Sequence, residues 1–131
     1  MKLLLDTHYV LEVVGDSEMG LSEPSLLEEL QKEAEFIVSV VSLWEAEIKS
    51  RMGKLRLRFG PQLWPNYLGA LEIKLLPVET RHVFGDIGVE IGHRDPFDRL
   101  LLSTAAAENC KLLTKDKLLQ SHPLAWRPFP S

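Results

Sequence analysis

The sequence predicts an α/β fold built on a parallel sheet with crossover helices. Four short apolar runs are spaced along the chain, and each is followed by a segment with the composition of a helix. This alternation is typical of parallel strands joined by helices. The runs are continuous rather than alternating, as expected for strands that are buried on both faces. They are residues 3–5, 36–41, 73–78 and 111–113.

Length and composition indicate one globular domain. The chain has 131 residues and neither an internal repeat nor a long linker, so we expect a single domain over residues 1–131. Hydrophobic residues make up 45% and charged residues 26% of the chain. This composition excludes an intrinsically disordered protein.

The sequence also predicts where the protein resides. The lone cysteine, Cys110, cannot form an internal disulfide, and the first residues lack the apolar core of a signal peptide. No apolar run approaches the roughly 20 residues needed to span a bilayer. We therefore expect a cytoplasmic protein with no membrane segment.

Several helix boundaries are marked by capping residues. The letters SLWE at 42–45 have the form of a capping box, in which Ser42 caps the helix and Glu45 reaches back, and Gly53 is placed to end it. Asp95 is a good N-cap before Pro96, and Asn109 is a suitable stop. Further helices are predicted over residues 25–35, 61–71 and 79–91, the last weakened by two glycines. The tail 121–131 is predicted to be extended, with an edge strand near residue 126.

Four acidic residues follow the predicted strands or open the next helix. In an open α/β sheet this carboxyl edge holds the ligand site. Each acid also has a structural explanation as a turn or helix cap, but all of them are predicted at one edge. Two carboxylates about 4 Å apart repel by roughly 4 kcal/mol at an effective dielectric of 20, so the group needs raised pKa values or a bound cation. The residues are Asp6, Glu45, Asp98 and Asp116.

An all-oxygen ligand set suits Mg²⁺ or Mn²⁺. No histidine and cysteine spacing of the zinc type competes with it, because the histidines are scattered. His82, His93 and His122 are expected at the surface or in turns, whereas His8 is close enough in sequence to Asp6 to approach the site.

Basic residues are unevenly distributed. The net charge of −4 and the pI near 5.6 exclude a protein that is basic over its whole surface. Between residues 48 and 71, however, there is no acidic residue at all. This segment is either a local contact for a polyanion or a solvated basic face. Its basic residues are Lys49, Arg51, Lys54, Arg56 and Arg58.

A carboxylate-held cation beside a basic segment has the elements of phosphodiester hydrolysis. Such an ion activates water and stabilises the leaving oxygen, so the pattern indicates a metal-dependent nuclease. Three basic residues adjoin the acids in sequence or lie one helical turn beyond, and each is a candidate phosphate contact or a plain surface charge. They are Lys49, Arg99 and Lys115.

Four motifs follow one another along the chain: LLLDTH, SLWEAEIKSRMGKL, HRDPFDRLLLSTAAAE and LLTKD. Together they resemble the PIN-domain family, specifically VapC-type ribonuclease toxins of toxin–antitoxin pairs. The resemblance implies a three-layer α/β/α fold and a Mg²⁺ or Mn²⁺ site that cleaves RNA. By motif position, the four family acids fall on Asp6, Glu45, Asp98 and Asp116. It further implies that Thr114 supports the site, that Asp95 remains the helix cap, and that the protein dimerises and binds a cognate antitoxin.

Other classes fit less well. A phosphoacceptor domain generally has an acidic pair at the end of its first strand, and an aspartyl-phosphate phosphatase has D-x-D, whereas His8 occupies the second position here. A dinucleotide-binding protein would show G-x-G-x-x-G after the first strand, which is absent. The strongest alternative is a catalytically degenerate PIN-like module that binds RNA or a protein partner. Glu47 is a weaker ligand candidate than Glu45, because it would point elsewhere on the helix.

Overall fold

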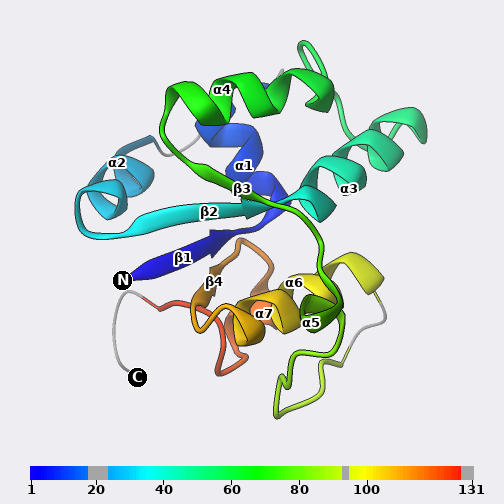
Figure 1. Ribbon diagram of the computed structural model, residues 1–131. Helices are drawn as coiled ribbons and strands as arrows, with labels where there is room; N and C mark the ends of the chain where they lie inside the picture. The colour runs from blue at the N-terminus through cyan, green and yellow to red at the C-terminus, as the bar shows by residue number, and fades with distance from the viewer. Residues whose placement is uncertain (18–23, 93–94, 128–131) are drawn as a thin grey trace.

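The computed structural model in Figure 1 describes residues 1–17, 24–92 and 95–127. Its four strands form one parallel sheet in the order β3-β2-β1-β4. All four predicted apolar runs contribute a strand, so the prediction of a parallel α/β sheet is confirmed. The strands are β1 (Lys2–Leu5), β2 (Glu35–Ser39), β3 (Lys74–Leu76) and β4 (Lys111–Leu113).

Helices cover both faces of the sheet. Helices α1, α2 and α4 lie on one side and α5, α6 and α7 on the other, while α3 extends from the carboxyl end of β2 (Figure 1). This is the three-layer arrangement that the resemblance implied. None of the helices in the described part of the chain is both long and apolar enough to cross a bilayer. The helices are α1 (Thr7–Val14), α2 (Pro24–Glu33), α3 (Val40–Arg51), the 3₁₀ helix η1 (Pro61–Leu63), α4 (Trp64–Ala70), α5 (Thr80–Val83), α6 (Pro96–Ala107) and α7 (Lys117–Gln120).

The strands supply two separate hydrophobic cores, which explains their continuous apolar sequences. In β1, Leu3 and Leu5 pack with α1, α2 and α4, whereas Leu4 packs with α6 on the opposite face. In β2, Phe36 alternates with Ile37 in the same way. Successive side chains of a strand point to opposite faces, so a strand covered on both sides needs apolar residues throughout.

Helix α3 begins earlier than the sequence predicted. Its N-cap is Ser39, whose Oγ accepts a hydrogen bond from the backbone N–H of Val41 at 3.1 Å. The capping box at Ser42 is therefore wrong, because β2 ends at Ser39 and the chain enters the helix at once. Ser42 is buried within the first turn, and its Oγ has no hydrogen-bond partner among the described residues. The helix ends just before Gly53, as predicted.

The predicted helix over residues 79–91 is mostly wrong. Only Thr80–Val83 is helical, and the chain then runs close to α6. A Cβ atom at Gly85 would lie 2.0 Å from the carbonyl oxygen of Ser103, so only glycine permits this approach. The other predicted helices are confirmed with small shifts, as α2, as η1 with α4, and as α6 between its Asp95 cap and Asn109.

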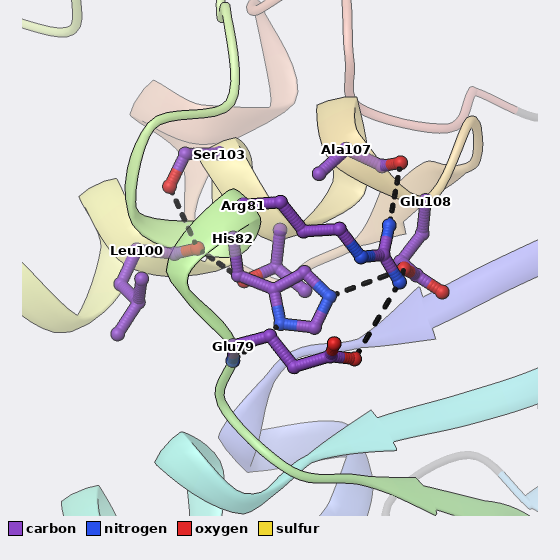
Figure 2. A network of polar contacts seen from close by, with 8 residues as sticks. Glu79, Arg81, His82, Leu100, Ser103, Ala107 and Glu108 are labelled. Carbon is purple, nitrogen blue, oxygen red and sulfur yellow. Dashed lines mark hydrogen bonds and ion pairs between the residues drawn. The ribbon is translucent and has the colours of Figure 1, made fainter.

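A buried histidine fastens α5 to the end of α6 (Figure 2). Nδ1 of His82 accepts a hydrogen bond from the backbone N–H of Glu79, and its Nε2 lies 3.1 Å from Oε2 of Glu108. Arg81 pairs with the same carboxylate. Burial raises the pKa of Glu108, but the hydrogen bonds from His82 and Arg81 and their charges outweigh it, so the pKa is lowered overall.

The histidine predictions are therefore only partly right. His82 lies within a helix and is fully buried, so the prediction of a surface or turn position is wrong for this residue. His122 does lie in a turn, but its ring is buried and its Nε2 lies 2.7 Å from the carbonyl oxygen of Val89. His93 is outside the described residues. The tail pairs with the sheet through a parallel bridge between Leu112 and Ala125, next to the predicted position, and residues 128–131 are likewise outside the described part.

Candidate active site

Asp6 lies at the carboxyl end of β1 and is almost completely buried. Its Oδ1 accepts a hydrogen bond from the backbone N–H of Tyr9 at 3.0 Å. Its Oδ2 accepts hydrogen bonds from the Thr114 hydroxyl at 2.7 Å and from the backbone N–H of Lys115 at 3.0 Å. Burial raises the pKa of Asp6, and these hydrogen bonds act against that rise. The carboxylate is thus held rigidly between the ends of β1 and β4.

Thr114 links two of the predicted acids. Its hydroxyl donates to Asp6 and accepts a hydrogen bond from the backbone N–H of Asp116 at 3.0 Å. Asp116 also caps α7, because its Oδ1 accepts hydrogen bonds from the N–H groups of Leu118 and Leu119. The T-x-D arrangement therefore places Asp6 and Asp116 on either side of one hydroxyl group, and Asp116 has the structural role that the sequence also allowed.

Glu45 faces the same edge of the sheet from α3. It is buried, and its Oε1 accepts a hydrogen bond of 2.5 Å from the hydroxyl of Thr7. Its Oε2 accepts a hydrogen bond from Nζ of Lys49, one turn along the helix. The sequence analysis missed Thr7, although its position directly after Asp6 was a usable signal. Asp6 and Thr7 together tie the end of β1 to β4 on one side and to α3 on the other.

Lys49 is the cation that the acidic residues of α3 and α6 share. Its Nζ lies 3.8 Å from Oδ2 of Asp95, in addition to its hydrogen bond to Glu45. Burial lowers the pKa of Lys49, but the Glu45 hydrogen bond and the charges of Glu45, Asp95 and Asp98 outweigh it and raise the pKa. Asp98 lies in the first turn of α6, as predicted, and is partly exposed.

Asp95 has two functions, of which the sequence predicted one. Its Oδ1 accepts a hydrogen bond from the backbone N–H of Phe97 at 2.9 Å, which confirms it as the N-cap of α6. Its Oδ2 faces Lys49. The second contact joins α6 to α3 and depends on tertiary packing, so no local pattern could reveal it.

Three of the other predicted residues, Arg99, Lys115 and Glu47, pair with an oppositely charged side chain. Arg99 pairs with Glu90 at the surface. The side chain of Lys115 pairs with Glu12 and lies over the ring of Tyr9. Glu47 pairs with Arg51 at 2.5 Å, which confirms that it points elsewhere than Glu45. His8 is exposed. Its charge lowers the pKa of Asp6, but by less than burial raises it.

The acidic residues form two groups rather than one closed cage. Asp6, Thr114 and Asp116 form the first group, and Glu45, Lys49 and Asp98 form the second, with Thr7 between them. Across residues 1–17, 24–92 and 95–127, no three Asp, Glu, His or Cys side chains are close enough to hold one metal ion. The donor atoms are nevertheless all oxygens, and the Lys49 ammonium already marks a position of bound positive charge.

A further buried carboxylate, Asp16, joins the segment after α1 to the start of η1 and of α4. Asp16 is fully buried, and its two oxygens accept hydrogen bonds from the N–H groups of Phe59 and Gly60 and from the indole N–H of Trp64. The sequence analysis did not single out Asp16. Its three donors lie more than forty positions along the chain, so only the folded structure shows its role.

Comparison with known proteins decides the family. The sequence profile of the PIN domain matches residues 3–123. The chain belongs to the PIN-domain family. The resemblance seen in the motifs is thereby confirmed, and the match spans all four predicted PIN-domain acids. No curated protein sequence gives a significant match to the chain.

Solved structures with the same fold include two that superpose on this chain about equally well. One is VapBC2 from Rickettsia felis, bound to a DNA fragment from the VapBC2 promoter, which superposes with a TM-score of 0.61 at 19% identity. The superposition covers 95% of this chain and 96% of the Rickettsia felis chain. DNA-bound VapBC from Salmonella typhimurium gives a TM-score of 0.60 at 15% identity and covers 95% of both chains. At these identities the similarity establishes the fold of this PIN domain.

Proposed function

We propose that this PIN domain is a metal-dependent endoribonuclease and the toxin of a VapC-type toxin–antitoxin pair. The observation that carries the proposal is the arrangement at the carboxyl edge of the sheet. There the buried carboxylate of Asp6 is fixed by Thr114 and the neighbouring Thr7 is bonded to Glu45. A buried, raised-pKa carboxylate with polar neighbours is a feature of functional sites.

The four acids of this edge would hold Mg²⁺ or Mn²⁺, because every donor is an oxygen. They are Asp6, Glu45, Asp98 and Asp116. Since no three of the described acids surround one position, their side chains would have to converge when the ion binds. When bound, such a cation supplies a nucleophilic water and stabilises the charge of the phosphate.

The protein's own groups have separate tasks. Thr114 fixes the direction of the Asp6 carboxylate, and Thr7 does the same for Glu45. Lys49 balances the negative charge of Glu45, Asp95 and Asp98 and is the candidate with a position suited to a phosphate of the RNA. Arg99 and Lys115 are less well placed, because their side chains pair with Glu90 and Glu12, which are not among the four proposed ligands.

The partners follow from the same proposal. Both structural neighbours are VapBC complexes, which supports a cognate antitoxin as the protein partner. RNA is the substrate, and the chain acts as one cytoplasmic domain that forms a homodimer.

A second candidate function has one observation in its favour. Since the described acids do not close around a single position, and Lys49 already neutralises Glu45, the domain could bind RNA or a partner without cleaving it. This is the catalytically degenerate alternative.

A cleavage assay separates the two candidates. Purified protein is incubated with structured RNA and Mg²⁺ or Mn²⁺, with and without a chelator. The nuclease proposal predicts cleavage that stops on chelation and falls by about 100-fold or more in Asp98→Asn. Glu47→Gln is the matched control, because Glu47 belongs to α3 but pairs with Arg51 outside the site. RNA binding without cleavage under every metal condition would favour the degenerate module.

A further inference from the structure

An aromatic pair spans the gap between the two helices that carry the acidic residues. Trp44 precedes Glu45 on α3, and Phe97 precedes Asp98 on α6. Their ring centroids are 5.4 Å apart, and the rings are inclined at 74°. Nζ of Lys49, which binds Glu45, lies 6.0 Å from the centroid of Phe97. The aromatic pair therefore lies next to Lys49 of the candidate active site.

Trp44 is unusually accessible for so large an apolar side chain. It is 59% exposed, whereas Trp64 is fully buried. In an edge-to-face contact, one ring uses its edge and the other uses one face. Whichever ring supplies the edge, at least one face of the indole is not covered by Phe97. Phe97 thus contacts Trp44 without covering both faces of the indole, and more than half of the surface of Trp44 is open to solvent.

Among residues 1–17, 24–92 and 95–127, the other exposed aromatic residues lack this combination of features. Tyr67 is stacked on Phe59 with a centroid distance of 4.8 Å, so one of its faces is already used. Phe84 is 78% exposed but follows α5, where it adjoins none of the four predicted acids in sequence. Trp44 combines exposure with an edge-to-face contact to Phe97, whose ring lies near the Lys49 ammonium.

We propose that Trp44, positioned by Phe97, is the stacking platform for one nucleobase beside the scissile phosphate. Proteins recognise single-stranded RNA by stacking unpaired bases on aromatic rings, and every base offers a π-face for such a contact. A phosphate lies within one nucleotide of each base, and Lys49 provides a positive charge next to the pair. This inference rests on the proposed ribonuclease function, and it adds a base-binding position to it.

The test uses a short single-stranded RNA of randomised sequence and three variants of the full chain. Trp44→Ala is expected to raise KM by about tenfold, because one base stack typically contributes that much to binding. Its kcat should stay close to that of the wild type. Trp44→Phe should restore most of the affinity, since it retains an aromatic face. Phe84→Ala, an exposed aromatic residue elsewhere, is the matched control and should bind like the wild type. Thermal melting checks that each variant is folded.

Two further measurements keep the outcomes distinct. Binding of the same RNA is measured in an Asp98→Asn background, where cleavage does not interfere, and the ends of the cleaved pool are sequenced. Weaker RNA binding by Trp44→Ala in this background, with the positions of the cuts unchanged, would support the platform, because an indole ring stacks on every base. If the wild type cleaves RNA and Trp44→Ala binds and cleaves identically, the platform is refuted while the nuclease proposal stands.

The remaining outcomes are equally decisive. If the wild type cleaves nothing, but Trp44→Ala still weakens RNA binding about tenfold, the nuclease proposal fails and the base-binding position survives. If no RNA binds to the wild type, both are refuted. If Trp44→Ala loses affinity for a cognate antitoxin and not for RNA, the exposed ring is a protein contact and the inference is overturned.

Discussion

The hydroxyl of Thr114 provides the sharpest test of how the site is held together. The substitution Thr114→Val keeps the shape of this buried side chain but removes the hydrogen bond to Asp6 and the acceptor for the N–H of Asp116. A hydrogen bond to a charged group contributes about 1.5–3 kcal/mol, so we expect a loss of about 2 kcal/mol in the free energy of unfolding. For a domain of this size that corresponds to a fall of roughly 8 °C in melting temperature.

The pH dependence of this loss carries the diagnostic information. Asp6 has a raised pKa in the folded protein, so its ionisation favours unfolding as the pH increases. Without the Thr114 hydroxyl the pKa should rise further, because that hydrogen bond stabilises the charged form. The difference in stability between the variant and the wild type should therefore be larger at a pH above the raised pKa of Asp6, where the carboxylate is charged, than at a pH below it.

The assay is urea unfolding at both pH values, with Thr104→Val as the control. Thr104 is also fully buried, but its hydroxyl donates to the carbonyl oxygen of Leu100 in α6 and not to Asp6. The control should lose stability equally at both pH values. A loss in Thr114→Val that does not depend on pH would refute the reasoning that its hydroxyl stabilises a charged Asp6.

Three further substitutions test other parts of the structure. Asp16→Asn replaces one of two accepting oxygens with an NH₂ group that faces N–H donors. Calorimetry should show a loss of about 2–4 kcal/mol in the free energy of unfolding. A loss below about 1 kcal/mol, which is the size of a surface effect, would contradict the buried role of Asp16. Gly85→Ala places a methyl group against the carbonyl oxygen of Ser103 and should cost about 1–3 kcal/mol, whereas an unchanged melting temperature would show that the loop moves freely. The pKa of Glu108 is lowered in the folded protein, so its contribution to stability is present above the unfolded value and is lost as the pH falls through the folded one. Glu108→Gln should accordingly flatten the acid side of the stability curve, and an unchanged curve would exclude this contribution.

Features that depend on neighbouring residues in the chain could be predicted from the sequence. The four strands were predicted because parallel strands buried on both faces require continuous apolar runs. The start of α6 was predicted because Asp95 and Pro96 satisfy the local geometry of a helix N-terminus. Thr114 and Asp116 belong to the same turn, so their contact is also local.

Features that depend on packing could not be predicted in this way. The contact of Thr7 with Glu45 and that of Lys49 with Asp95 join different elements, and no pattern within either element indicates them. Helix α3 shows a related difficulty, because serines at 39 and 42 both suit an N-cap. The end of β2 determines which of them is used, and that end depends on pairing with β3. Helix α5 stops early because the backbone of α6 lies close to Gly85.

Binding of Mn²⁺ is the measurement that tests the central claim most directly. Electron paramagnetic resonance can follow the titration in the wild type, in Asp98→Asn and in Glu47→Gln. The last variant is the matched control, because Glu47 belongs to α3 but pairs with Arg51 outside the site. We predict that the wild type and Glu47→Gln bind the ion with similar affinity. Asp98→Asn should bind it at least about tenfold more weakly, since even groups outside the ligand shell typically contribute about 10–100-fold to metal affinity. Equal affinity in all three proteins, or no binding by the wild type, would contradict the claim that this acidic edge is a metal site.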